Sequence, residues 1–399
     1  MSDMVECSAR GAGPRVLQIL PGLGEGGAES GAIDLARYMT AQGWTPIVAS
    51  HGGRGETELR ELGVTTRRLP LHAKNPVILA NVRRLQALVR EFGVQLIHAR
   101  SRAAAWSGYY AARRCGIPFV TTFHGIYSGS DRFFKHRYNR IMARGDRVIA
   151  VSEHVACHLR ERYGVEASRL RVIPRGIDLD RFAAAAVGQD RLDALVRHWN
   201  LRAQAPRRTK IVMLPGRLTR IKGHLLLLEA IGQMERRNFT CLLVGGLNRQ
   251  SRYVREIEGQ IERRGLGKVV RLVGGCRDMP AALALADVVV VPSIGPEALG
   301  RVSLEAQALG KPVVATNIGG LGETLVPAST GWLVPPGDPA ELARALELAL
   351  AMPDDARARL AIRARRLVER RFGAEGMTAS TLAVYRELLT ENRPTHVQP

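Results

Sequence analysis

Cysteines, aromatic residues and long apolar runs are all scarce in this 399-residue chain. The five cysteines are odd in number and form no C-x-x-C pair; they are Cys7, Cys115, Cys157, Cys241 and Cys276. This pattern argues against a disulfide framework or a zinc site and favours a reducing compartment. No apolar stretch approaches the roughly 18 residues of a membrane-spanning helix, and residues 1–14 lack the apolar core of a signal peptide. We therefore expect a cytoplasmic protein.

Acidic residues are also in short supply. The chain has 37 Asp and Glu against 58 Lys and Arg, a formal net charge of +21. Such a balance predicts attraction to nucleic acid, anionic lipid or phosphate-bearing substrates, although an arginine-rich composition also fits a GC-rich genome. At 46% apolar residues, the chain is rich enough for packed cores, and its length suggests two domains or one large one.

Strand-like and helix-like apolar segments alternate along the chain in two sets. Strands are predicted at residues 16–20, 46–50, 66–69, 95–99, 119–122, 147–151 and 170–173, and again at 210–214, 240–244, 269–273, 288–291, 312–315 and 332–334. This alternation predicts an α/β protein with two Rossmann-like domains of parallel strands. The N-terminal domain is expected over 1–186, a linker over 187–209 and the C-terminal domain over 210–375. The first strand of each half enters a Pro-Gly turn, at Pro21-Gly22 and at Pro215-Gly216.

Two carboxylates follow the apolar segment 288–291. A loop carries Glu297, Gly300 opens a helical pattern, and Glu305 comes eight positions after Glu297. Ligands of open parallel sheets bind beyond the carboxyl ends of strands, where backbone N–H groups at a helix start can hold a phosphate. Glu305 would then accept the hydroxyls of a ribose, and Glu297 would lie near the group that the phosphate carries. The simpler alternative is two solvated glutamates.

Two cations occur where a diphosphate beside these acids would need them. Arg217 and Lys222 lie in the turn after the predicted strand 210–214. A guanidinium binds phosphate oxygens in a bidentate manner and an ammonium acts as a point charge, so the pair suits a diphosphate. In a chain with 58 basic residues, one surface Arg and one surface Lys is the alternative.

Together these segments resemble the retaining glycosyltransferases of family 4, which have the GT-B fold. The resemblance rests on Gly26-Gly27 with Glu29, the Gly216–Gly223 turn, the Glu297-to-Glu305 spacing, and Gly319-Gly320 with Glu323, in that order. It implies an acceptor-binding N-terminal domain, a C-terminal domain for the nucleotide-sugar donor, and a C-terminal helix over 376–392 that packs back on the first domain. It further implies that no metal or other cofactor is needed, because protein cations and the helix start stabilise the leaving diphosphate.

The resemblance also assigns residues by position. Gly26 and Gly27 would border the donor phosphate, Leu299 and Gly300 would contact it through the backbone, and His124 would lie near the donor sugar. His124 follows the predicted strand 119–122, and the alternative is a histidine that only orders its loop. Arg175 stands where relatives usually have Asn, and an anionic acceptor is one possible partner for it.

A dinucleotide enzyme is the other interpretation of the Gly22-to-Gly27 loop, which matches G-x-G-x-x-G. That fingerprint needs an acid at the end of the second strand, about 20 residues on. Here the second strand ends in Ser50-His51-Gly52, without one. We therefore interpret the loop as a segment whose glycines let the donor or the acceptor approach the backbone closely.

Residues 98–147 form a strongly basic region, with ten basic side chains and only two acids. Within it, apolar and basic residues interleave at near-helical spacing between Phe133 and Arg144. Such a helix can lie in an anionic lipid interface, and the alternative is an ordinary half-buried helix with a solvated basic face.

The sequence thus predicts a retaining glycosyltransferase that uses a nucleotide-diphospho-sugar and a saccharide or lipid-linked acceptor. A role in cell-envelope polysaccharide, lipopolysaccharide or glycolipid synthesis, at the cytoplasmic face of the inner membrane, is expected. The alternatives are a GT-B sugar-phosphate synthase or nucleotide-sugar epimerase, and a basic nucleic-acid-binding protein. Against the last, no RNA-binding aromatic motif or zinc-finger spacing is present.

Overall fold

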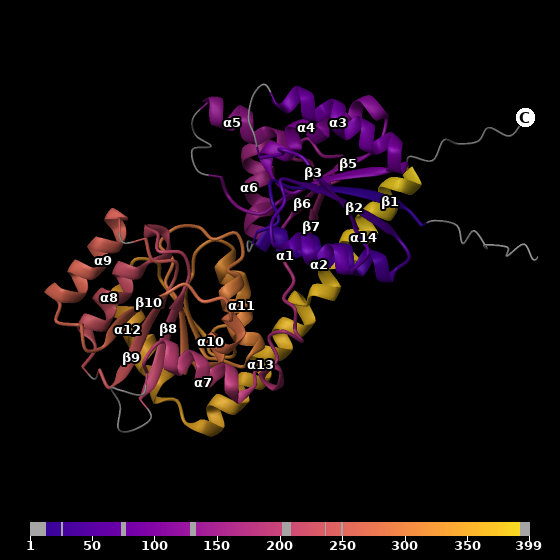
Figure 1. Ribbon diagram of the computed structural model, residues 1–399. Helices are drawn as coiled ribbons and strands as arrows, with labels where there is room; N and C mark the ends of the chain where they lie inside the picture. The colour runs from indigo at the N-terminus through magenta and orange to yellow at the C-terminus, as the bar shows by residue number, and fades with distance from the viewer. Residues whose placement is uncertain are drawn as a thin grey trace, which may run out of the picture. The chain divides into compact units, whose positions relative to one another are not determined.

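A computed structural model describes residues 13–24, 27–72, 77–127, 133–201, 209–235, 237–248 and 250–391 (Figure 1). Contacts between residues divide the chain into two compact units. The first comprises Met1–Val151, Val155–Ile173 and Glu375–Pro399, and the second comprises Ser152–His154 and Pro174–Ala374.

The first unit is built on a seven-stranded parallel sheet in the order β3-β2-β1-β4-β5-β6-β7. Its strands are β1 (Arg15–Ile19), β2 (Thr45–Ser50), β3 (Thr65–Arg68), β4 (Leu96–Ala99), β5 (Phe119–Phe123), β6 (Arg147–Ala150) and β7 (Leu170–Val172). Its helices are α1 (Gly27–Ala41), α2 (Gly55–Glu61), α3 (Val77–Phe92), α4 (Arg102–Cys115), α5 (Phe133–Asn139), α6 (Glu153–Tyr163) and α14 (Ala374–Glu391).

The sheet is covered on both faces, which explains why its central strands are apolar throughout. On one face α1 and α14 pack through Leu35, Met39 and Tyr385. On the other face α4 lies so close that a Cβ on Gly108 would sit 2.3 Å from Ile19 Cδ1. Strands buried on two sides cannot alternate apolar and polar residues, so β4 and β5 are buried at every position.

A buried polar group also joins α14 to the sheet. His98 on β4 is fully buried, with Nδ1 2.5 Å from the Tyr385 hydroxyl and Nε2 2.7 Å from Thr122 Oγ1. Burial, with a smaller contribution from Arg100, holds the pKa of His98 well below its usual range. The imidazole is therefore neutral, and the two hydrogen bonds satisfy both ring nitrogens.

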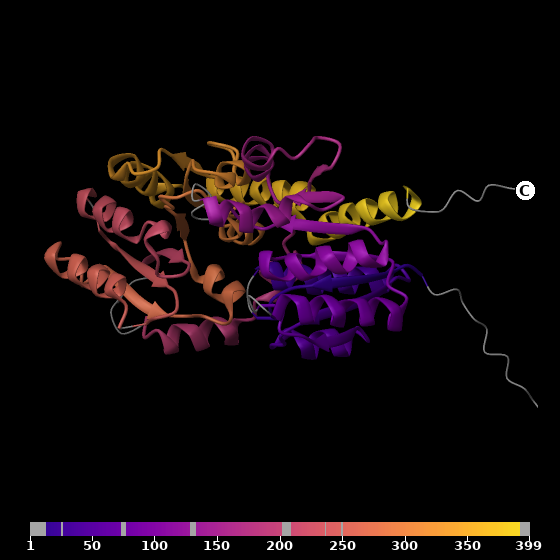
Figure 2. The same ribbon diagram turned by 90° about the horizontal axis from the view of Figure 1, so that it is seen from above.

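The second unit has a six-stranded parallel sheet in the order β10-β9-β8-β11-β12-β13. Its strands are β8 (Lys210–Pro215), β9 (Phe239–Val244), β10 (Val270–Gly274), β11 (Val288–Val291), β12 (Val313–Thr316) and β13 (Trp332–Val334). Its helices are α7 (Gln189–His198), α8 (His224–Gln233), α9 (Arg252–Arg263), α10 (Met279–Leu285), α11 (Arg301–Ala308), α12 (Pro339–Ala351) and α13 (Asp354–Phe372). Figure 2 shows helices on both sides of this sheet as well.

The predicted α/β class and all the predicted strands are confirmed, with ends that differ by a residue or so. Two predictions differ from the structure. The helix expected between Phe133 and Arg144 is instead the short α5 followed by a 3-10 turn over Arg140–Ala143. The division between units falls after Ile173 rather than at 186, and the expected linker contains α7, which an Arg191–Asp278 ion pair holds to α10.

No helix within the described ranges is long and apolar enough to cross a membrane.

Candidate active site

The second unit brings the predicted donor residues to one point of its sheet. β8 lies between β9 and β11, so the chain leaves β8 toward one side of the sheet and later returns to the other side. The crevice at such a reversal, beyond the carboxyl ends of the strands, is where open α/β sheets bind ligands. The turn after β8 carries Arg217 and Lys222, and the loop after β11 carries Glu297.

Lys222 and Glu297 are in direct contact. Lys222 Nζ donates to Glu297 Oε1 at 2.5 Å, and Ser293 Oγ donates to the same oxygen at 2.7 Å. The side chains of the ion pair are 18% and 17% exposed, so a ligand would meet both. The sequence analysis placed the cation of Lys222 opposite the acid of Glu297. The structure shows that the two side chains are bonded to each other, so a diphosphate would share Lys222 with Glu297.

Two glycines allow the site's segments to approach one another. Gly223 has φ of +71°, and a Cβ there would lie 1.7 Å from the Pro292 carbonyl oxygen. Gly300 has φ of +84° at the start of α11, and its Cβ would lie 2.4 Å from Leu321 Cδ1. Only glycine tolerates both the left-handed backbone and this crowding.

Glu305 lies on α11, 8% exposed, and forms an ion pair with Arg301 at 2.9 Å. Burial raises the pKa of its carboxyl, and the positive charges of Arg301, Arg181 and Arg175 oppose that rise. The sequence prediction treated Glu305 as an open acceptor for ribose hydroxyls and missed Arg301. The cations of Arg175 and Arg181 come from a segment more than 100 residues away, which spacing alone does not reveal.

The remaining residues predicted to bind the donor differ in exposure and in what they contact. The Arg217 side chain is exposed, and among the described residues none forms a hydrogen bond or ion pair with its guanidinium. The Leu299 side chain is 2% exposed and belongs to the core, so only its backbone is available for a phosphate. The Gly319-Gly320 turn packs on the acidic loop, where the Gly320 N–H donates to the Glu297 carbonyl at 2.8 Å.

The other predicted site residues belong to the first unit. His124 is half-buried directly after β5. Gly27 begins α1, which follows β1, whereas Gly26 lies outside the described residues. Both described residues stand at the carboxyl edge of the first sheet, the edge where parallel sheets bind ligands.

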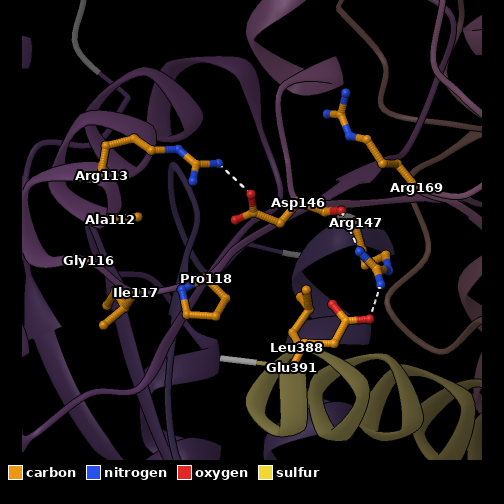
Figure 3. A pocket seen from close by; sticks show the side chains of 10 residues that line it. All are labelled: Ala112, Arg113, Gly116, Ile117, Pro118, Asp146, Arg147, Arg169, Leu388 and Glu391. Atoms are coloured by element: carbon orange, nitrogen blue, oxygen red, sulfur yellow. Dashed lines mark hydrogen bonds and ion pairs between the residues drawn. The ribbon is translucent and has the colours of Figure 1, made fainter. Parts of the chain in front are cut away.

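A cavity of about 480 Å³ lies at the opposite edge of the first sheet (Figure 3). Three arginines line it, but each is satisfied within the unit. Arg113 is bound to Asp146, Arg147 to the α14 carboxylates of Glu387 and Glu391, and Arg169 to backbone carbonyls. These contacts hold α14 and the loops at the amino edge, and none of the predicted site residues takes part.

Comparisons with known proteins agree with this geometry. Residues 25–181 match the model "Glycosyltransferase Family 4" and residues 199–367 match "Glycosyl transferases group 1". A D-inositol 3-phosphate glycosyltransferase of Salinispora arenicola is 31% identical, over 83% of this chain and 77% of the relative.

Two solved GT-B structures are also similar. A glycosyltransferase of Rickettsia africae is 34% identical with a TM-score of 0.85, covering 94% of this chain and 99% of the other. Anabaena HepE, solved in complex with UDP and glucose, is 25% identical with a TM-score of 0.80, covering 94% and 100%. The motifs, the two parallel sheets and these similarities agree: the chain is a nucleotide-sugar-dependent enzyme with the GT-B fold that belongs to glycosyltransferase family 4.

Proposed function

We propose that the chain is a retaining enzyme that moves a sugar from a nucleoside-diphosphate sugar to a saccharide or lipid-linked acceptor. The observation that carries the proposal is the contact of Lys222, Glu297 and Ser293 where the order of the second sheet reverses. A cation and an acid held together there match a donor that has an anionic diphosphate next to a sugar.

The chemistry follows from charge. As the bond between the anomeric carbon and the β-phosphate oxygen breaks, the sugar becomes positive and the phosphate gains negative charge. Lys222, Arg217 and the N–H groups at the start of α11 would stabilise the phosphate without a metal or other cofactor. Glu297 would orient the sugar and support its positive charge. In this proposal the acceptor attacks from the face that the phosphate leaves, and the phosphate takes the acceptor's proton.

A uridine nucleotide is the proposed donor class. Anabaena HepE has been solved with UDP and with UDP-glucose, and the identity to this chain is 25–26% across these structures. Glu305 would accept the ribose hydroxyls, with Arg301 fixing its carboxylate.

The donor proposal is tested by heating the protein with UDP-, GDP- and ADP-sugars in EDTA. A UDP-sugar at a hundred times its dissociation constant should stabilise the fold by about 2.7 kcal/mol, and the others should have little effect. Sugar release from the same donor should continue in EDTA. Strict loss of activity, restored only by Mg²⁺ or Mn²⁺, would contradict the assignment of the diphosphate to Arg217 and Lys222.

For the acceptor we propose a saccharide or glycolipid of cell-envelope, lipopolysaccharide or polysaccharide synthesis. A sugar-phosphate synthase is the second candidate, because the sucrose-phosphate synthase of Thermosynechococcus elongatus is 26% identical over 95% of this chain, with a TM-score of 0.78. A nucleotide-sugar epimerase would differ from both enzymes, because its product is a free or epimerised sugar that is not joined to an acceptor. Mass spectrometry of the product formed from each acceptor distinguishes the three.

We further propose peripheral contact with an anionic membrane at the cytoplasmic face. Ile141 and Met142, which the sequence pattern placed on a lipid-facing side, are buried in the first unit. Phe134 is 84% exposed, and Arg137 and Arg140 are exposed beside it on α5 and the following turn. The membrane surface is therefore proposed as this smaller patch, in which one ring and several cations meet lipid.

Vesicle sedimentation tests the patch. The enzyme should bind phosphatidylglycerol vesicles at low salt, leave phosphatidylcholine vesicles, and dissociate in roughly 0.5 M salt, where charges are strongly screened. Changing Arg137, Arg140 and Arg144 together to Gln should release it, as should Phe134→Ser. The control triple on α3, Arg83, Arg84 and Arg90 to Gln, removes equal charge; equal loss of binding in both triples would disprove this location.

A further inference from the structure

The Gly319-Gly320 motif with Glu323 takes no part in the proposed function. It forms the loop after β12 and a 3-10 turn over Gly320–Thr324. The turn lies against the backbone of the acidic loop. A Cβ on Gly319 would sit 2.6 Å from the Glu297 carbonyl oxygen, and the Gly320 N–H donates to that same oxygen at 2.8 Å. The position of the Glu297 backbone therefore depends on where this turn is held.

Glu323 binds the start of α6 with both of its carboxylate oxygens. Its Oε2 accepts from the Glu153 N–H at 2.9 Å, and its Oε1 accepts from the His154 N–H at 2.7 Å. The first N–H groups of a helix have no partner within the helix, and the helix dipole favours a negative charge there. Hydrogen bonds to an ionised carboxylate are also stronger than neutral ones. Glu323 is therefore a cap of α6 that comes from a distant part of the chain.

The same turn packs against the residue that precedes α6. Ser152 is fully buried, and a Cβ on Gly320 would sit 3.0 Å from its Oγ. Ser152–His154 accordingly belong to the second unit, whereas the chain on either side of them belongs to the first. Helix α6 thus begins in the second unit, and Glu323 fixes its beginning to the turn that supports Glu297.

The turn is also fixed to α11, through residues other than Glu323. Thr324 is fully buried, and its Oγ1 lies 2.9 Å from Ser303 Oγ. The Thr324 carbonyl accepts from Gln307 Nε2 at 2.8 Å. Because these bonds do not involve Glu323, the turn should stay folded when that carboxylate is removed, and only its attachment to α6 should be lost.

We propose that Glu323 is a positioning residue for sugar transfer, which acts on Glu297 through the backbone of the Gly319-Gly320 turn. It contacts neither the sugar nor the diphosphate. By fixing the turn to α6, it keeps the Glu297 carboxylate where positive charge develops on the sugar. The inference rests on the role proposed for Glu297 and adds to it the residue that supports this role. A misplacement of about 1 Å can slow a reaction about a hundredfold, so the loss of this support should appear in kcat.

Steady-state kinetics with a UDP-sugar test this role. Glu323→Ala should lower kcat by about tenfold or more, and the dissociation constant of UDP should hardly change. Glu323→Gln keeps one acceptor oxygen for the helix start, so its kcat should fall between those of the Ala variant and the wild type.

The matched control is Asp338→Ala. Asp338 caps α12 of the same unit, where its Oδ1 accepts from the Glu341 N–H at 3.0 Å. Both Ala variants lose a helix cap and should have lower melting temperatures than the wild type. Only Glu323→Ala should lower kcat, measured well below either melting temperature. Equal kcat in the two variants would show that Glu323 has a structural role alone.

A double variant tests whether Glu323 acts through Glu297. In the Glu297→Ala background, Glu323→Ala should cause no further fall in kcat, because the group that it positions is already absent. Two losses that multiply in full would overturn the inference. If Glu297→Ala alone leaves kcat unchanged, the role proposed for Glu297 fails, and a measurement without substrate then decides the role of Glu323.

Hydrogen exchange supplies that measurement. The Gly320 amide, which donates to the Glu297 carbonyl, should exchange faster in Glu323→Ala than in the wild type or in Asp338→Ala. This result would show that the cap holds the turn, whatever the enzyme transfers. Faster exchange at the start of α6 with unchanged exchange at Gly320 would show that Glu323 only caps the helix, and the inference would be overturned.

Discussion

Glu297→Ala is expected to lower kcat for sugar transfer by about a hundredfold or more, the usual cost of removing one preorganised charge from an active site. The carboxylate acts on the sugar as positive charge develops, so its loss should appear in kcat and kcat/KM alike. The affinity for UDP, which lacks the sugar, should hardly fall. In this variant the carboxylate of Glu297 no longer competes with the diphosphate for the ammonium group of Lys222. Steady-state kinetics with the best UDP-sugar, together with calorimetry of UDP, measure both effects.

The matched control is Glu256→Ala. Glu256 pairs with Arg220 in the turn that also holds Lys222, but its partner is 60% exposed, so the lost pair should matter little. Ser293→Ala removes one hydrogen bond to Glu297 and keeps the ion pair, so an intermediate loss is expected. If Glu297→Ala and Glu256→Ala have the same kinetics, the role proposed for Glu297 is wrong.

Glu305→Ala is expected to weaken UDP binding by roughly 10- to 150-fold, the equivalent of about 1.5–3 kcal/mol for charge-assisted hydrogen bonds to the ribose. At saturating donor, kcat should change far less, since the ribose is remote from the bond that breaks. Calorimetry with UDP and with uracil as the ribose-free probe measures the difference, and uracil binding should not respond to the change.

Replacing Glu305 by Gln is expected to change the stability of the fold and the affinity for UDP in opposite directions. Burial raises the folded-state pKa of Glu305, so ionising it costs folding free energy. That cost is absent below the unfolded pKa and is complete once the pH has risen through the folded pKa. At pH 7 the Gln variant without ligand should therefore be at least as stable as the wild type, yet bind UDP more weakly. A variant that loses stability and keeps UDP affinity would show that Glu305 only supports the fold through Arg301.

The two sheets could be predicted from the sequence because the patterns that indicate their strands are local. Strands such as Val288–Val291 are continuous apolar runs between turns, and a parallel strand buried on both faces requires that pattern. The glycines at the strand ends could be identified from the sequence for the same reason. The left-handed backbone of Gly223 and Gly300 excludes other residues, so the glycine itself marks the turn.

The helix near residue 140 shows where local signals fail. The spacing of Ile141 and Met142 among basic residues resembles a lipid-facing helix, but helical periodicity does not say what covers the apolar side. In the structure that side packs into the first unit, and a 3-10 turn replaces the end of the helix.

By itself, the sequence determined the α/β class, the strands, the order of the motifs and the family, because each depends on neighbours in the chain. Only the tertiary structure decided that Lys222 bonds to Glu297 across 75 positions, and that the positive charges of Arg301, Arg181 and Arg175 act on the carboxyl of Glu305. Those relations depend on which strand ends become adjacent when the sheets form. Strand order is a property of the assembled sheet, fixed by the packing of many segments at once.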